Sequence, residues 1–251
     1  MHGSTTLKKM DGISYNNIFE TKGIEYLVVI AFLLLLIPFW LLLNKKVSIP
    51  SRIRKALGIL TAGALKIPQG ILYHPNHTWA YLDMSGTARV GLDDLLLHIT
   101  GDVRFHHLKK PGDKIKKGDL LSEIEHDGKS LRIFSPLSGE IVDTNAVLTD
   151  NPGLLHEDPY LRGWMYQVRP TRWIAETSSC YLAEDATNWF ANELDRFKLF
   201  LSGTAGSFSP DNSRMVLQDG GELTDHPLSN LPVEVWNNFQ QDFLNQIDAS
   251  R

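Results

Sequence analysis

The segment EIEHDGKSLRIFSP, residues 123–136, decides the fold of this chain. Residues 120–126 alternate between two sets of side chains, as a strand does, and residues 131–134 supply the apolar side of a second strand. Asp127 and Gly128 stand between these strands. A type I′ turn needs a positive φ at both central residues, which an Asp-Gly pair adopts at little cost. The segment therefore predicts a tight β-hairpin.

This hairpin resembles the arm of the glycine cleavage system H protein, a carrier of lipoyl-lysine. The family pattern is Glu-Ser-Val-Lys-Ala, with Ser-Pro seven residues after the lysine. Glu125 matches the glutamate and Ser135-Pro136 matches the Ser-Pro, which puts Gly128 at the position of the lysine. The resemblance therefore implies a carrier domain that has lost its attachment residue and holds no lipoyl group.

Lys129 stands one residue after that position. A shift of one residue along a strand turns a side chain to the opposite face, so an enzyme that reads the geometry of the tip is expected to miss it. Two interpretations stay open for Lys129: a solvated hairpin lysine, which we favour, or a displaced lipoyl site. It is the one candidate cofactor-binding residue, and no cofactor is expected.

The resemblance continues in the same order and spacing through residues 70–170. It implies a mainly β fold, a barrel-sandwich hybrid with flanking helices, in which Gly112, Gly118 and Gly139 are expected at turns. The other matching segments are residues 73–79, 91–94, 101–103, 111–113, 117–119, 135–142, Asn145, 150–152, 157–160 and 163–164.

The composition excludes several classes of partner and of cofactor site. The chain has 251 residues, of which 43% are hydrophobic, and a formal net charge of −4, so no basic excess indicates a nucleic-acid partner. The single cysteine, Cys180, excludes an intrachain disulfide, a four-cysteine zinc site, a cysteine-ligated iron–sulfur cluster held by this chain alone and haem attachment through a Cys-x-x-Cys-His motif. Any redox centres beside this protein would belong to other subunits.

Residues 26–43 read YLVVIAFLLLLIPFWLLL and contain no charge. About 20 apolar residues span a bilayer, so these 18 predict one transmembrane helix, with a cleaved or buried helix as the alternative. More lysines and arginines follow the segment than precede it, which puts the C-terminal side in the cytoplasm. The basic run 51–60 is expected to form either an amphipathic helix on the inner leaflet or a short connecting helix packed on a partner.

Apolar side chains recur at helical spacing after residue 170, in two stripes. The first predicts a helix over residues 182–201 that stops near Gly203, and the second includes Trp236, Phe239 and Phe243. This tail is too small to form its own core, and bulky aromatic residues dominate interfaces. We expect it to dock onto another subunit, with folding back on the β domain as the alternative. The predicted domains are residues 1–25, 26–43, 44–69, 70–170 and 171–251.

Other polar groups give weaker signals. His74 and His77, and the adjacent His106 and His107, have metal-like spacing. Neighbouring strand residues point to opposite faces, and His77 matches a histidine of the family, so no metal site is expected. A basic region is expected to be solvated, with a partner or lipid surface as the alternative; it contains Lys109, Lys110, Lys114, Lys116 and Lys117.

No nucleophile–base pair, phosphate-binding loop or dinucleotide motif is recognisable, so we expect no catalysis. The favoured hypothesis is a non-catalytic subunit of a membrane complex, single-pass in the inner membrane, with its lipoyl-type domain docked in the cytoplasm onto other subunits. A respiratory or electron-transfer complex is the setting suggested by analogy. The alternatives are a lipoyl carrier modified at Lys129 and a membrane-bound assembly factor.

Overall fold

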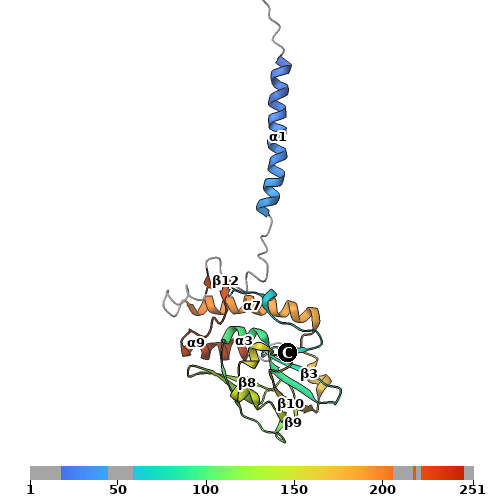
Figure 1. The fold of residues 1–251 in the computed structure, drawn as a ribbon, viewed down its shortest axis with the longest axis vertical. Helices are drawn as coiled ribbons and strands as arrows, with labels where there is room; N and C mark the ends of the chain where they lie inside the picture. The colour runs from blue at the N-terminus through green and yellow to red at the C-terminus, as the bar shows by residue number, and fades with distance from the viewer. Residues whose placement is uncertain (1–17, 45–58, 206–216, 219–221, 246–251) are drawn as a thin grey trace, which may run out of the picture. The chain divides into compact units, whose positions relative to one another are not determined.

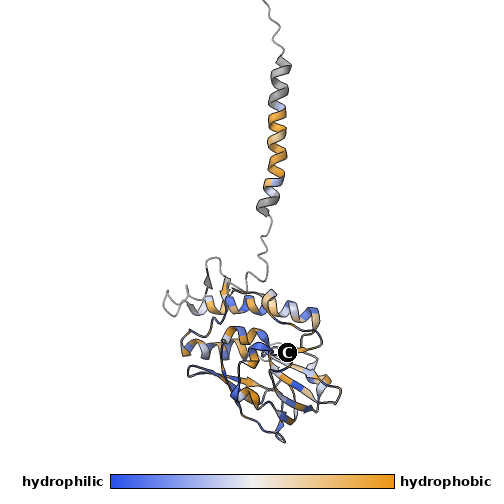
Figure 2. Ribbon diagram, in the orientation of Figure 1, coloured by the Kyte–Doolittle hydropathy of each residue, from blue (hydrophilic) through white to orange (hydrophobic). Residues whose placement is uncertain are grey.

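The computed structural model describes residues 18–44, 59–205, 217–218 and 222–245, and the chain divides into two compact units, 1–49 and 50–251. Helix α1 (Ile18–Asn44) forms the first unit, with Pro38 inside it (Figure 1). Its side chains are described for residues 26–40, which are exposed and mostly hydrophobic (Figure 2). In the part of the chain that the structure describes, no helix combines the length and apolar character needed to cross a membrane. The predicted span 26–43 reaches beyond these side chains and stays a prediction.

The second unit contains antiparallel sheets. The largest has the strand order β2-β3-β4-β10-β9-β6, and two smaller ones have the orders β5-β7-β8 and β1-β12-β11. The strands are β1 (Ile59–Leu60), β2 (Leu72–His74), β3 (Thr78–Leu82), β4 (Ala88–Leu92), β5 (Arg104–His107), β6 (Lys114–Ile115), β7 (Leu120–His126), β8 (Lys129–Phe134), β9 (Gly139–Thr144), β10 (Trp164–Pro170), β11 (Leu217–Gln218) and β12 (Glu222–Thr224).

Helices flank these sheets (Figure 1). The long α7 (Ala183–Ala205) and the short α3 (Asp94–Thr100) matter most for the site. Asp93 caps α3, because its side chain accepts a hydrogen bond from the backbone N of Leu96 at 2.8 Å. The remaining helices are η1 (Ala62–Ala64), α4 (Val147–Asp150), α5 (Leu154–Glu157), α6 (Trp173–Thr177), α9 (Val233–Asn238) and the π-helix η2 (Phe239–Leu244).

The predicted hairpin is confirmed. β7 pairs with β8, and His126 lies opposite Lys129. Asp127 and Gly128 have φ values of 48° and 77°, the left-handed conformation that a type I′ turn requires at both positions. A side chain at Gly128 would meet nothing within 4 Å, so the turn needs glycine for its backbone conformation and not for space.

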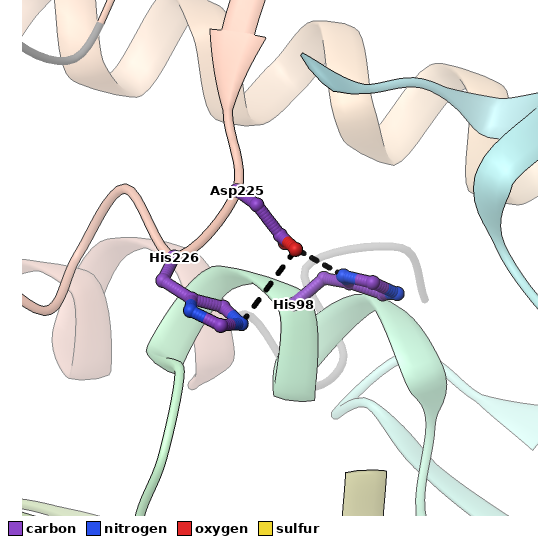
Figure 3. Close-up of side chains that lie close together, drawn as sticks. All are labelled: His98, Asp225 and His226. Atoms are coloured by element: carbon purple, nitrogen blue, oxygen red, sulfur yellow. Dashed lines mark hydrogen bonds and ion pairs between the residues drawn. The ribbon is translucent and has the colours of Figure 1, made fainter. Parts of the chain in front are cut away.

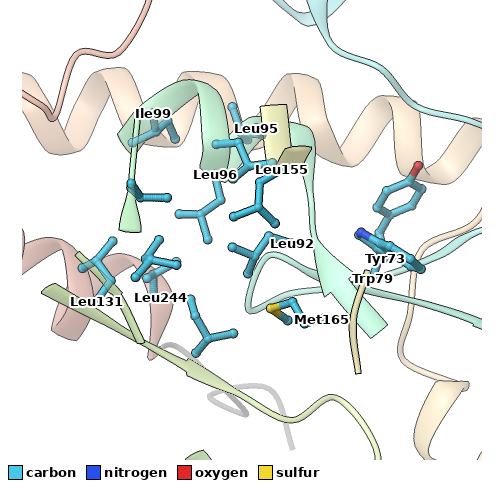
Figure 4. Close-up of a cluster of buried hydrophobic side chains, with 14 of the residues drawn as sticks. Tyr73, Trp79, Leu92, Leu95, Leu96, Ile99, Leu131, Leu155, Met165 and Leu244 are labelled. Atoms are coloured by element: carbon cyan, nitrogen blue, oxygen red, sulfur yellow. The ribbon is translucent and has the colours of Figure 1, made fainter. Parts of the chain in front are cut away.

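One core joins the sheets and the helices, and the fold is mainly β with flanking helices, as predicted. Figure 4 shows buried side chains of β4, α3, β8, α5 and β10 gathered together, with Tyr73 of β2 and Trp79 of β3 next to each other at one side. Trp79 and Tyr73 are fully buried among them. Burial of such side chains is the main favourable term in folding, at about 25 cal/mol per Å² of apolar surface.

Three local expectations need correction. Gly139 does not occupy a turn but begins β9, where an added Cβ would lie 2.3 Å from the carbonyl oxygen of Arg169, so close strand approach is what requires glycine there. Helix α7 runs past Gly203 to Ala205. At the end of the run 51–60, Ile59 and Leu60 form a strand and not a helix, because they pair with β12; residues 51–58 lie outside the described structure.

The three aromatic side chains expected to anchor a partner pack inside the chain itself, so that expectation is wrong for them. Trp236, Phe239 and Phe243 are each at most 1% exposed. Phe239 and Phe243 contact Phe197 of α7, with ring centroids 5.6 Å away in both cases. Helix α7 supplies an apolar face for the tail, and the alternative of folding back on the β domain holds for this part of residues 171–251.

Candidate functional site

The C-terminal segment packs against Lys129 and His126, which flank the hairpin turn, whereas Asp127 and Gly128 of the turn itself are exposed. The ammonium of Lys129 donates hydrogen bonds to the carbonyl oxygens of Ser229, at 2.5 Å, and Leu231, at 3.3 Å. It also lies 5.4 Å from the centroid of the Trp236 ring, within the range of a cation–π contact. Lys129 is therefore held against the protein by three groups, and the solvated lysine expected from the sequence is corrected to a packed one.

Further contacts hold the C-terminal segment against the hairpin. The ring of His126 stacks on Trp236, with an interplanar angle of 5°. The backbone N of Arg132 donates to the side-chain oxygen of Gln240 at 2.6 Å, so an edge of β8 is also occupied. Trp236 in turn donates its indole N–H to the carbonyl oxygen of Leu228. We call residues 226–245 the cover, since they contact β8 and the residues that flank the hairpin turn.

A buried ionic network ties α7 and the cover to the β domain. Nδ1 of His77 lies 2.9 Å from Asp93 Oδ2, and its Nε2 lies 3.4 Å from Glu193 Oε2. Glu193 also accepts a hydrogen bond from Nε of Arg196 at 2.9 Å. The Arg196 guanidinium lies 3.7 Å from the centroid of the Phe243 ring and donates to that residue's carbonyl oxygen. Charge therefore links the turn before β3, α7 and η2.

This network keeps His77 charged. Complete burial by itself lowers the pKa of His77, but the carboxylates of Asp93 and Glu193 outweigh it and raise the pKa to about 9. The same pairing with His77, reinforced by Arg196, lowers the pKa of Glu193 against its burial. The imidazole is also stacked between Trp189 and Phe243. At neutral pH the imidazole is therefore a buried cation paired with two carboxylates, although its Nε2, 3.4 Å from Glu193, makes no hydrogen bond.

A second cluster lies where the cover meets α3. Asp225 and His226 follow β12, and His98 lies in the last turn of α3. Nδ1 of His98 is 2.7 Å from Asp225 Oδ1, and Nε2 of His226 is 3.7 Å from Asp225 Oδ2 (Figure 3). Burial lowers the pKa of His98, but the carboxylates of Asp225 and Asp94 outweigh it and raise the pKa to about 9. These three side chains could together hold a metal ion.

The histidines singled out in the sequence do not converge. His74 Nδ1 contacts the Asn76 side chain at 2.8 Å, whereas His77 contacts Asp93. His106 faces Glu125, and His107 Nε2 faces the carbonyl oxygen of Asn145. Sequence reasoning missed the cluster of His98, Asp225 and His226, because 127 residues separate the first two and no motif connects them.

Comparison with known proteins identifies the fold. Residues 71–192 match the family model described as "Glycine cleavage H-protein". A probable glycine cleavage system H protein of Thermococcus kodakarensis is 35% identical over 113 residues, 45% of this chain and 84% of that protein. The H protein of Kocuria rhizophila is 40% identical over 104 residues, 41% of this chain and 81% of that protein.

A similar solved structure is that of a glycine cleavage system H protein from Mycobacterium marinum. It is 31% identical, covers 42% of this chain and 87% of that one, and superposes with a TM-score of 0.39. Two facts establish the relationship to H proteins: the sequence identities, and the large share of each of these two relatives that the alignment covers. This chain belongs to the glycine cleavage H-protein family.

Proposed function

We propose that this chain is a non-catalytic accessory subunit that uses an H-protein-like domain, without a lipoyl group, as a rigid docking module in a membrane complex. The observation that carries the proposal is the state of the hairpin tip. Gly128 stands at the attachment position, and the neighbouring Lys129 is bound by the cover. A carrier needs a free, mobile arm, whereas this arm is tied to its own protein.

The chemistry of Lys129 supports the same conclusion. Acylation removes the charge of the ammonium, and with it the contact to the Trp236 ring and one of the two hydrogen bonds to the carbonyl oxygens of Ser229 and Leu231. A modifying enzyme would first have to displace the cover, which is anchored by the fully buried Trp236. This cost adds to the shift by one residue from the family's position.

The membrane part of the proposal rests on the sequence of residues 26–43. They carry no charge, and Lys45 and Lys46 follow after Asn44. We propose a single anchor with the C-terminal unit in the cytoplasm, which gives a docking module a fixed position. A respiratory or electron-transfer complex is the setting that we favour, by analogy only.

Intact-mass spectrometry of the natively expressed chain tests the proposal. We expect no lipoyl adduct, in the wild type and in the matched variant Lys129→Arg alike. A stoichiometric adduct that disappears in Lys129→Arg would overturn the docking proposal. Membership of a membrane complex is tested by purification from membranes in mild detergent, followed by identification of the co-purifying subunits. A chain that behaves as a free monomer contradicts it.

The second candidate is a lipoyl carrier modified at Lys129. Membership of the H-protein family favours it, because the relatives that match are named as glycine cleavage H proteins. It requires the cover to open, so that Lys129 exchanges its protein partners for solvent. The adduct measured above decides between the two candidates.

A further inference from the structure

We propose that His98, Asp225 and His226 form a binding site for a divalent transition-metal ion of the zinc class, which fastens the cover to α3. The three potential ligand atoms all lie within 4.8 Å of one another. Zinc bonds of about 2.1 Å at tetrahedral angles place neighbouring ligand atoms about 3.4 Å apart. The distances of 2.7 Å and 3.7 Å from Asp225 to His98 and His226 bracket this value, so small side-chain rotations suffice.

The backbone holds the ligands in place before any ion binds. The backbone N of His226 donates to the carbonyl oxygen of His98 at 2.9 Å, and the N of Leu228 donates to that of Ile99 at 3.0 Å. The segment that carries Asp225 and His226 is therefore joined directly to the end of α3. Figure 3 shows the side chains of His98 and His226 approaching Asp225 from the two segments. A site built on hydrogen-bonded backbone loses less conformational freedom when an ion binds.

A second carboxylate orients the first ligand. Nε2 of His98 lies 3.5 Å from Oδ2 of Asp94, which is 2% exposed and accepts the backbone N of Lys66 at 2.7 Å. Metal-binding histidines commonly give their second ring nitrogen to a carboxylate, which fixes the tautomer and ring orientation. Asp94 would occupy that role and leave Nδ1 of His98 for the ion.

The donor set selects the class of ion. Two imidazole nitrogens and one carboxylate oxygen suit zinc and its neighbours, whereas calcium and magnesium prefer ligands that are all oxygen. His226 and Asp225 are partly exposed, with 40% and 36% of their side-chain surface accessible, so a fourth position is open to water or to a partner's side chain. Because Ser229 binds both the carbonyl oxygen of His226 and the ammonium of Lys129, the ion would stabilise the cover over the hairpin.

The test is titration of the full chain, purified in nonionic detergent without a polyhistidine tag and stripped with chelator, with Zn²⁺ by calorimetry. We expect about one ion per chain, and a loss of affinity of at least tenfold in His226→Gln and in Asp94→Asn, about the size of known second-sphere effects. His106→Gln is the matched control: this exposed histidine contacts Glu125 and should leave binding unchanged.

Co²⁺ provides an independent readout, because its visible absorption becomes intense when the ion enters a four-coordinate protein site. The intense bands should appear in the wild type and in His106→Gln and be absent in His226→Gln. Zn²⁺ should also raise the melting temperature of the wild type and not that of His226→Gln. Absence of binding below about 1 mM Zn²⁺, the range of very weak association, overturns the site. Binding that is equal in the wild type and in folded His226→Gln overturns it as well.

Discussion

The buried charge of His77 should make the unfolding free energy fall as pH rises from about 6.5 to about 9. The ordinary pKa of a histidine is 6.5, and the fold raises the pKa of His77 to about 9. A group whose pKa is raised by folding stabilises the protein fully below the unfolded value, and this contribution is lost as pH rises through the folded value. A pKa difference of one between the folded and unfolded states corresponds to about 1.36 kcal/mol, so the contribution of His77 is on the order of 3 kcal/mol.

The perturbation is His77→Asn. Residue 77 has a φ of 60°, and asparagine is among the few residues that tolerate this left-handed conformation, so the substitution removes the titration with little backbone strain. Below pH 6.5 the variant should be less stable than the wild type, because Asp93 and Glu193 lose the cation between them. The difference should shrink by about 3 kcal/mol at high pH, where the wild-type imidazole is neutral.

The assay is urea unfolding at a series of pH values from about 6 to about 10, followed by tryptophan fluorescence, since Trp189 stacks on His77. His98 titrates in the same window, because its pKa is also raised to about 9. Both proteins contain His98, so the difference between wild type and variant isolates His77. Parallel stability curves across this range would refute the argument, because the network would then store no charge-dependent stability.

Three further outcomes follow from the structure. A fragment of residues 45–251 should be soluble without detergent and melt cooperatively, because the second unit contains the whole described core; aggregation on gel filtration would contradict this. Phe239→Ala should lower the unfolding free energy by about 3–5 kcal/mol, as expected for a fully buried ring, whereas the exposed Leu199→Ala should change it by less than about 0.5 kcal/mol. Gly139→Ala should lower the unfolding free energy by about 1–3 kcal/mol, because the added methyl group meets a backbone carbonyl of β10. The control Gly203→Ala lies in a helix with open space around it and should be neutral or stabilising. Equal effects of the two substitutions in urea unfolding would show that the close contact at Gly139 relaxes.

Local features of the chain were readable from the sequence. The Asp127-Gly128 turn follows from backbone preference alone, and the strands on either side follow from alternation. The amphipathic period of α7 is also local. Residues 70–170 also match the H-protein pattern in order and spacing. The fold of the whole domain could therefore be predicted from the sequence, in addition to the single hairpin.

The candidate sites were less readable, because their parts are far apart in the chain. The packing of Lys129 depends on carbonyl groups about 100 residues later, at Ser229 and Leu231, which carry no side-chain signal at all. The aromatic stripe of Trp236, Phe239 and Phe243 indicated burial but not against what. Hydrophobic burial is non-directional, so a stripe fits a partner as well as its own domain until the partner surface is known.

By itself, the sequence determined the arm hairpin and the H-protein-like domain, since both depend on backbone preferences or on short-range spacing. Only the tertiary structure decided that residues 226–245 lie over the hairpin, that His77 is locked between Asp93 and Glu193, and that His98 meets Asp225 and His226. The physical reason is that ion pairs and metal ligands act over a few ångströms in space, and chain folding alone sets those distances.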